Sequence, residues 1–149
     1  MTVSRSLVLL LALVLLGGCN VAIAAEEAED TTASLDTTPA MEEAREWLVA
    51  MDGGRYGDAW ESASESFRGS IERVKWEIAA QQGRNAAGVL IARKLRSSTY
   101  MRQVPGAPIG EYVAIVYDSR FERRTVALEL LTAERGKDGR WRIAGYSIR

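Results

Sequence analysis

The sequence predicts an α+β domain in which N-terminal helices pack on a curved antiparallel β-sheet. Apolar residues recur at helical spacing before Gly88 and alternate with polar ones after it. Turn signals separate the alternating segments, as in an antiparallel meander. Helices followed by a run of strands are typical of the α+β class. We expect residues 40–149 to form this single domain, since they are numerous enough for one hydrophobic core.

Two helices are expected first. Thr38 can cap the first helix, Pro39 suits its first position, and glycines at 53 and 54 end it after Asp52. Its apolar stripe consists of Met41, Ala44, Trp47, Leu48 and Met51. The shorter second helix has apolar residues at the same spacing, namely Tyr56, Ala59, Trp60 and Ala63.

A third helix is expected to start at Ser70, a residue that can cap it. Its apolar side consists of Ile71, Val74 and Ile78, and Trp76 lies well off that side. Either the helix is covered on both sides or the Trp76 indole is partly exposed. We interpret the other prominent aromatic residues as core packing, and these are Trp47, Tyr56, Trp60 and Trp141.

Four strands are expected after the helices. The first covers residues 92–104, and Pro105 and Gly106 then occupy the middle positions of a type II turn. The second strand, within residues 110–121, has an apolar face formed by Val113, Ile115, Tyr117 and Phe121. The third, within residues 125–133, has Val126, Leu128 and Leu130 on its apolar face. A Lys-Asp-Gly turn at residues 137–139 precedes the last strand, residues 141–148.

Asp118 in the second strand and Glu129 in the third both fall opposite these apolar faces. We therefore expect both carboxylates in solvent. This placement argues against a carboxylate held in an apolar pocket.

The first 39 residues have the pattern of an export signal and a tether. Residues 7–16 are apolar and uncharged but too short to cross a bilayer of about 30 Å, so residues 1–18 are interpreted as a lipoprotein signal peptide. Cys19 follows two glycines and is the expected lipidation site, and residues 19–39 form an acidic flexible tether. The alternative is cleavage before Ala25, which leaves a soluble periplasmic or secreted protein.

Lipidation would anchor the protein in the cell envelope, facing the periplasm. Asn20, rather than an aspartate, follows the cysteine, which favours the outer membrane. The membrane is therefore an expected partner through the N-terminal lipid, together with an envelope protein or a small ligand. Export disfavours nucleic acid as a partner.

The composition excludes several kinds of chemistry. The chain has no histidine and a single cysteine, so imidazole and thiolate metal sites, disulfides in the domain and Ser-His triads are excluded. We predict no catalytic, cofactor-binding or metal-binding residues. The basic charge is concentrated in residues 84–149, with 13 basic and 6 acidic residues. The pairs Arg93-Lys94 and Arg123-Arg124 are interpreted as solvated charge, and an anionic partner is the alternative.

Three segments carry a resemblance to a known family, together with Trp76 and the triplet RKL at residues 93–95: AREWLVAMDGGRYGDAW at residues 44–60, PGAPIGEY at 105–112 and WRIAGYSIR at 141–149. Together they resemble the bacterial family called domain of unknown function 4019, over about residues 41–149. The resemblance implies an exported protein and brings no assigned activity. The element order is also similar to the cone-shaped nuclear-transport-factor-2-like fold, which is an analogy of fold alone.

We expect a non-catalytic envelope domain that binds a protein or small ligand through its concave sheet or its basic strand half. A purely structural or assembly role is one alternative. The other is an isomerase-like enzyme using Asp and Tyr in a cone pocket. Surface loops often carry binding residues, so the candidate contact loop consists of Pro105, Gly106, Ala107 and Pro108.

Overall fold

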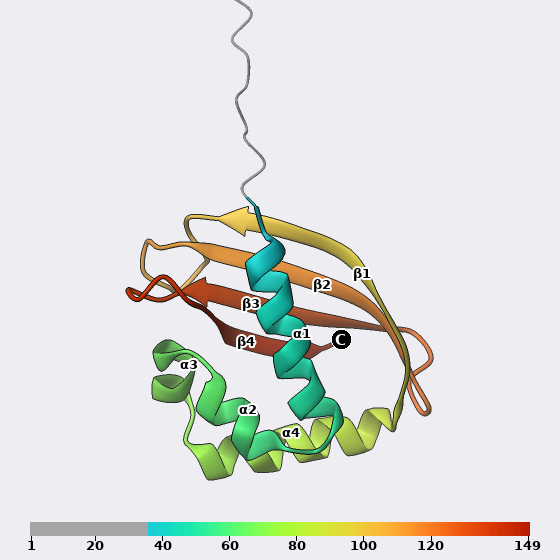
Figure 1. Ribbon diagram of the computed structural model, residues 1–149. Coiled ribbons are helices and arrows are strands. Elements are labelled where there is room, and N and C mark those ends of the chain that lie inside the picture. The colour runs from blue at the N-terminus through green and yellow to red at the C-terminus, as the bar shows by residue number, and fades with distance from the viewer. Residues whose placement is uncertain (1–35) are drawn as a thin grey trace, which may run out of the picture. The chain divides into compact units, whose positions relative to one another are not determined.

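A computed structural model describes residues 36–149 of the chain (Figure 1). The helices are α1 (Thr38–Asp52), α2 (Tyr56–Ser62), α3 (Glu65–Ser70) and α4 (Arg73–Ala87). The strands are β1 (Leu90–Met101), β2 (Tyr112–Phe121), β3 (Ala127–Arg135) and β4 (Trp141–Ile148). This arrangement confirms the predicted α+β class. The predicted signal peptide, Cys19 and most of the predicted tether lie outside the described residues.

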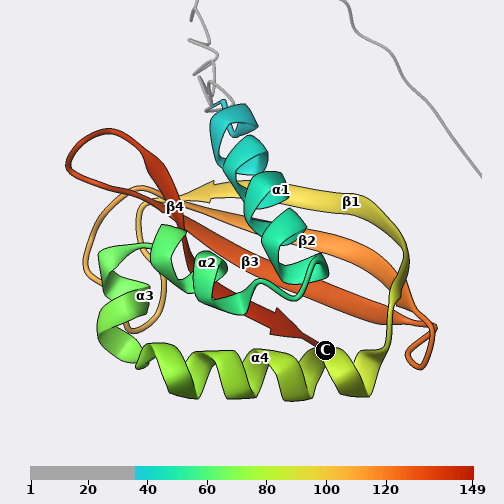
Figure 2. The ribbon, with the colours of Figure 1, turned by 60° about the horizontal axis from the view of Figure 1, so that its bottom comes forward.

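The four strands form one antiparallel sheet in the order β1-β2-β3-β4, so each strand pairs with its neighbour in sequence. Helix α1 lies across one face of this sheet, and α4 runs close to the end of β4 (Figures 1 and 2). Strand β1 bends where its register with β2 shifts, after Leu90 and after Leu95. The nuclear-transport-factor-2-like cone stays a prediction.

The first two helices match their predictions closely. Pro39 lies in the first turn of α1, and the helix ends at Asp52 before Gly53 and Gly54. Gly54 adopts a φ of 71°, a left-handed conformation that favours glycine. The predicted cap at Thr38 is wrong by one position, because Thr38 is already helical and Thr37 precedes the helix.

The predicted third helix corresponds to α4, its predicted cap at Ser70 and its predicted buried side are wrong, and α3 was not predicted. Ser70 ends α3, whose cap is Ser64, and α4 starts at Arg73. Val74 is 65% exposed, whereas Trp76 is 7% exposed and packs edge-on to the Phe67 ring at a centroid distance of 4.9 Å. The buried residues of α4 are Trp76, Ala80, Arg84 and Ala87. The large indole buries more area than a valine does, so it determines which face of the helix turns inward.

Aromatic side chains form the centre of the core. The ring of Trp47 lies 5.9 Å from that of Trp76 and 5.2 Å from that of Tyr146. The indole N–H groups of Trp47 and Trp76 both donate to backbone carbonyls of α2, at Ala59 and Tyr56 respectively. The other three predicted aromatic residues, Tyr56, Trp60 and Trp141, are half-buried against this core, which confirms the packing interpretation.

The predicted face of β2 is confirmed, but that of β3 is inverted. Ala127, Glu129, Leu131 and Ala133 point into the core, while Leu128 and Leu130 are half-buried and Val126, which precedes the strand, is exposed. Pairing with β2 determines which face of β3 is buried, because directly opposite residues share a face of the sheet. Leu131 lies opposite the buried Ile115. Glu129 lies opposite Tyr117 and is therefore buried.

Candidate functional site

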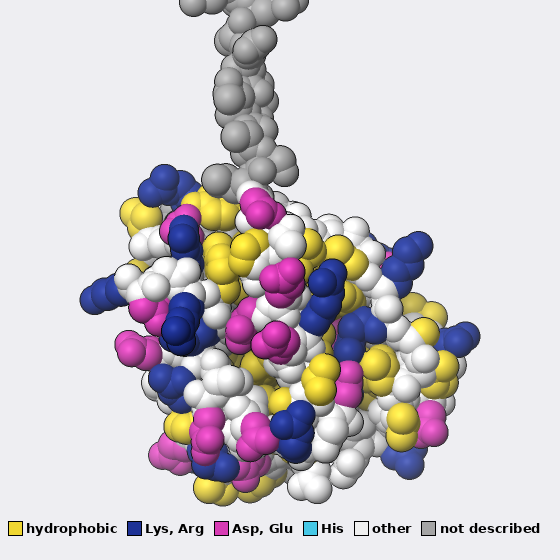
Figure 3. Space-filling model, viewed as in Figure 1, with side chains coloured by type: hydrophobic (Ala, Val, Ile, Leu, Met, Phe, Trp, Pro, Cys, Tyr) yellow, Lys and Arg dark blue, Asp and Glu magenta, His cyan; other side chains and the backbone are white. Residues whose placement is uncertain are grey.

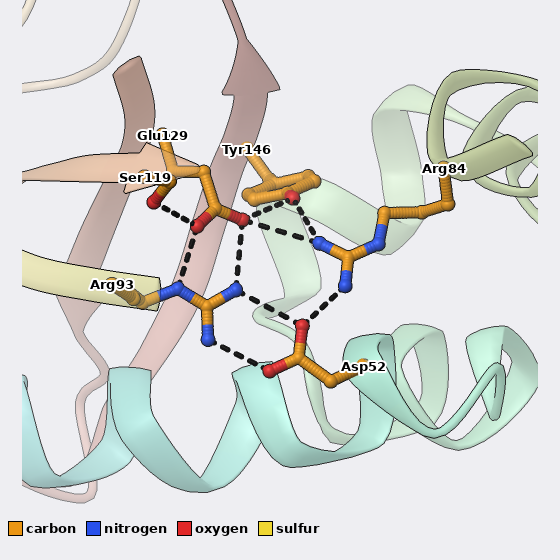
Figure 4. A network of polar contacts seen from close by, with 6 residues as sticks. All are labelled: Asp52, Arg84, Arg93, Ser119, Glu129 and Tyr146. Atoms are coloured by element: carbon orange, nitrogen blue, oxygen red, sulfur yellow. Dashed lines mark hydrogen bonds and ion pairs between the residues drawn. The ribbon is translucent and has the colours of Figure 1, made fainter. Parts of the chain in front are cut away.

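Six polar side chains meet between the sheet and the helices (Figure 4). Each comes from a different element: Asp52 from α1, Arg84 from α4, Arg93 from β1, Ser119 from β2, Glu129 from β3 and Tyr146 from β4. We call this group the buried polar network. It links every strand to two of the helices.

Glu129 is the centre of the network and is fully buried. Its Oε2 accepts hydrogen bonds from Arg93 Nε at 2.5 Å and Ser119 Oγ at 2.6 Å. Its Oε1 accepts from Tyr146 OH at 2.7 Å, Arg93 Nη2 at 3.0 Å and Arg84 Nη1 at 3.3 Å. Four side chains therefore saturate the two carboxylate oxygens.

Asp52 is the second anion of the network. Arg93 forms a bidentate pair with it, Nη1 to Oδ2 at 2.7 Å and Nη2 to Oδ1 at 3.0 Å, and Arg84 Nη2 also donates to Oδ1. Two guanidinium groups thus face two carboxylates, and each guanidinium contacts both of them. Charge balance and full hydrogen bonding are the conditions under which buried charges are tolerated.

The network fixes the protonation of its members. Burial alone would raise the pKa of Asp52, but the hydrogen bonds and charges of Arg93 and Arg84 lower that pKa below its usual value. Burial and the adjacent Glu129 carboxylate raise the pKa of the Tyr146 hydroxyl far above its usual range. Burial opposes the charge of Arg93, yet hydrogen bonds to both carboxylates raise the pKa of its guanidinium. Near neutral pH Tyr146 is therefore a hydrogen-bond donor and the arginines are cations.

This arrangement is suited to holding the fold together rather than to proton transfer. A general base must come within hydrogen-bond reach of the proton it abstracts. Glu129 has no exposed surface, and Tyr146 both donates to Glu129 and accepts from Arg84 Nη1 at 3.2 Å. Carboxylate and tyrosine thus lie together, with Glu129 enclosed and the Tyr146 hydroxyl hydrogen-bonded to two members of the network.

A pocket of about 480 Å³ opens beside the network, between α4, β4 and the β2–β3 turn. Its apolar lining includes Trp76, small residues of α4 and Ile148. Arg84 and Tyr146 form part of its wall, so the network holds that wall in place. Arg123 and Arg124 contribute the remaining cations of the lining.

A group of acidic side chains gathers over α1 on the helix-covered face, with apolar side chains exposed on either side of that helix (Figure 3). The acidic residues of α1 around this surface include Glu42, Glu43 and Glu46. The lining of the α4–β4 pocket, by contrast, contains no Asp or Glu.

A family model described as "Protein of unknown function (DUF4019)" matches residues 43–146. The chain belongs to this family. All six residues of the buried polar network lie inside the matched segment, as does most of the α4–β4 pocket. No protein of curated function matches the chain. Membership of the DUF4019 family therefore names no activity, and function has to be argued from the site.

The candidate contact loop of this DUF4019 protein connects β1 to β2. Ala107 N donates to Val104 O at 3.1 Å and Gly106 has a φ of 81°, which confirms the predicted type II turn. The carbonyl of Pro108 accepts a hydrogen bond from Tyr112 OH at 2.9 Å, and Pro105 is exposed. The loop lies apart from the network and the α4–β4 pocket, and its role as a contact surface stays a prediction.

Pro108 also borders a second hollow of about 500 Å³, beside the β3–β4 turn. Two ion pairs lie in its lining: Arg135 with Glu111 at 3.2 Å and Arg142 with Asp138 at 2.7 Å. The lining carries charges of both signs, so it does not favour a ligand of either charge.

The two predicted solvated pairs behave differently. Lys94, Arg123 and Arg124 are exposed as expected, but the prediction is wrong for Arg93, whose side chain is 14% exposed and bonded to Asp52 and Glu129. Sequence reasoning also missed Arg84. A signal existed, because Arg84 lies two helical turns after Trp76 and therefore on the same face of α4.

None of the helices within residues 36–149 is both long and apolar enough to span a membrane. No group of three or more acidic, histidine or cysteine side chains in this part of the chain is arranged to hold a metal ion.

Proposed function

We propose that this DUF4019 protein is a non-catalytic binding module of the cell envelope that holds a small ligand in the α4–β4 pocket. The observation that carries the proposal is the pocket itself. Its volume of about 480 Å³ falls within the range of roughly 300–1,000 Å³ typical of small-molecule sites. Its mixed lining of apolar groups and a few polar ones is also typical of such sites.

The state of the neighbouring carboxylates supports binding over catalysis. Ketosteroid-isomerase-like chemistry needs a carboxylate base that reaches the substrate. Glu129 is the carboxylate nearest to a tyrosine in the core, and its oxygens are occupied by Arg84, Arg93 and two hydroxyl groups. Because the hydrogen-bonding groups of Glu129 already have partners, they stabilise the pocket wall and do not provide a free base for catalysis.

Gly83 offers a test that leaves the fold intact. It lines the pocket within α4, and a Cβ added there meets no atom within 4 Å. Gly83→Leu therefore adds a bulky side chain to the pocket lining, and replacing a mid-helix glycine is expected to stabilise α4 by up to about 1 kcal/mol. The matched control is Gly69→Leu, at a helical glycine of α3 that also has open space and lines no pocket described above.

The probe is N-phenyl-1-naphthylamine, an uncharged aromatic molecule whose fluorescence rises in apolar surroundings. We expect the wild-type protein and Gly69→Leu to bind it saturably at one site, and Gly83→Leu to lose that binding while unfolding at the same or a higher temperature. Equal binding by Gly83→Leu, or no saturable binding by the wild type, would contradict the proposal.

We further propose that a lipid on Cys19 holds this module at the envelope membrane, with the outer membrane favoured. The support is the sequence pattern around Cys19. Two or three acyl chains, as in bacterial lipoproteins, hold a protein firmly, whereas one alone is marginal. Cys19→Ser should move the protein from the membrane fraction to the soluble fraction and abolish palmitate labelling. Wild-type protein that is soluble, unlabelled and begins at Ala25 would overturn this.

A further inference from the structure

The α4–β4 pocket has an unusual charge balance. Its lining carries three arginines, Arg84, Arg123 and Arg124, and no acidic side chain. The charge of Arg84 is already matched, because it pairs with Asp52 and Glu129 in the buried polar network. The other two arginines form no ion pair with any described residue. Two positive charges therefore face the pocket without a counter-ion from residues 36–149.

Backbone hydrogen bonds hold these two arginines in place. Arg123 N donates to Ala87 O at 2.9 Å, and Arg124 O accepts from Phe121 N at 2.9 Å. Their guanidinium groups contact only neutral carbonyl oxygens: Arg123 Nη1 donates to Asn85 O at 2.6 Å and Arg124 Nη1 to Ile148 O at 3.4 Å. A guanidinium has five N–H donors, so most donors of each group are left for another acceptor.

Arg123 also removes an obstacle to anion binding. The pocket lies near the C-terminal end of α4, where free carbonyl groups make the helix end electronegative. The hydrogen bond from Arg123 to Asn85 O covers one of these carbonyls with a positive charge. The charge near this helix end thus becomes more favourable to an anion.

We infer that the ligand of this pocket is an amphipathic anion, with its acidic group between Arg123 and Arg124 and its apolar body against α4. This inference rests on the proposed binding function and gives the ligand its chemical class. The apolar body would lie along Trp76 and the small residues of α4, which are Ala79, Ala80, Gly83, Ala86 and Ala87. The acidic group would accept the free guanidinium donors, and such charge-assisted bonds are stronger than neutral ones.

A pair of probes isolates the contribution of the acidic group. 1-Anilinonaphthalene-8-sulfonate has the ring system of N-phenyl-1-naphthylamine with one added sulfonate, so the two probes differ in the anion alone. We expect the wild-type protein to bind the sulfonate probe at least about tenfold more tightly, as two charge-assisted contacts imply. Raising the sodium chloride concentration from about 0.05 to about 0.5 M should weaken binding of the sulfonate probe and leave binding of the uncharged probe unchanged.

The double variant Arg123→Gln/Arg124→Gln should bind the sulfonate probe about tenfold or more weakly than the wild type does. Its affinity for the uncharged probe should stay within about twofold of the wild-type value. The charge-matched control is Lys94→Gln with Arg120→Gln, two exposed cations of β1 and β2 that line no pocket described above and form no ion pair within residues 36–149. The control should bind both probes as the wild type does.

Three results would overturn the inference: equal wild-type affinity for both probes, no loss in the Arg123/Arg124 variant, or an equal loss in the control, which would indicate net charge alone. Each of these leaves the proposed function standing if Gly83→Leu still abolishes binding of the uncharged probe. Absence of saturable binding of either probe to the wild type would overturn both proposals.

Discussion

Glu129→Gln is expected to destabilise the domain by about 3 to 5 kcal/mol, the usual cost of removing one partner of a buried ion pair. The side chain is fully buried, and glutamine has nearly the same shape, so a cavity contributes little. The loss comes from hydrogen bonding and charge. The amide nitrogen replaces an acceptor that now receives at least two donors, and Arg84 and Arg93 each lose one counter-ion.

Asp118→Asn is the matched control, because the sequence pattern puts both carboxylates on the polar side of their strands. Asp118 pairs with Arg96 at 2.6 Å, but the two side chains are 48% and 54% exposed. Exposed pairs contribute about 0 to 1 kcal/mol, so we expect a loss within that range.

Urea denaturation at neutral pH measures both losses. For a domain of this size a loss of 3 to 5 kcal/mol corresponds to a fall in melting temperature of roughly 12 to 20 °C. The reasoning would be refuted if Glu129→Gln were no more costly than Asp118→Asn, since Glu129 would then lie in solvent. A large loss for both variants would show instead that the Arg96 pair is shielded from water.

Three further predictions concern the core and the network. Trp76→Ala and Trp47→Ala should each lower the free energy of unfolding by about 3 to 5 kcal/mol, because both indoles are buried. A clearly smaller loss for Trp76→Ala in urea denaturation would contradict the burial of Trp76. Tyr146→Phe should cost about 1 to 3 kcal/mol, whereas Tyr117→Phe should cost almost nothing, because the buried Tyr117 hydroxyl has no hydrogen-bond partner among residues 36–149. Because the pKa of Asp52 is lowered in the folded protein, the unfolded chain binds the proton first, so wild-type stability should fall as pH drops from about 5 towards 2. The free energy of unfolding of Asp52→Asn, measured in urea, should fall less steeply with pH across that window than that of the wild type. An equal slope for the two proteins would contradict this prediction.

Elements that depend on local chemistry were predictable from the sequence. The stripe of α1, the glycines that end it and the type II turn at Gly106 each depend on residues close together in the chain. Their physical basis is helical spacing, or a positive φ that glycine adopts at no steric cost. Tertiary contacts do not override such features here.

The buried sides of α4 and β3 required contacts that the sequence does not display. Both segments have apolar residues on two sides, and the side with more large aliphatic residues is not the one that faces the core. In α4 the packing of Trp76 against Phe67 and Trp47 determines which side faces the core, and Val74 and Ile78 are left exposed. In β3 the register with β2 sets the face, since a shift of one residue would turn every side chain over.

The site was the least predictable part, because its contacts are long-range. Arg84 and Glu129 are 45 residues apart, and Arg93 and Asp52 are 41 apart. The alternating pattern puts both Glu129 and Asp118 opposite the predicted apolar faces of their strands, so it does not distinguish the buried carboxylate from the exposed one. Only the meeting of six elements at one point identifies which charges are buried.

The partners of the arginines indicate which of these cations serve the fold and which are free for a ligand. Arg84 and Arg93 each contact two carboxylates, so a ligand anion would gain little from them and would compete with Asp52 and Glu129. Arg123 and Arg124 reach the same pocket region from the β2–β3 turn and contact neutral carbonyls only. An anion between them would replace solvent without displacing an internal partner. For this reason the acidic end of a ligand is expected at the turn, with its apolar body directed along α4.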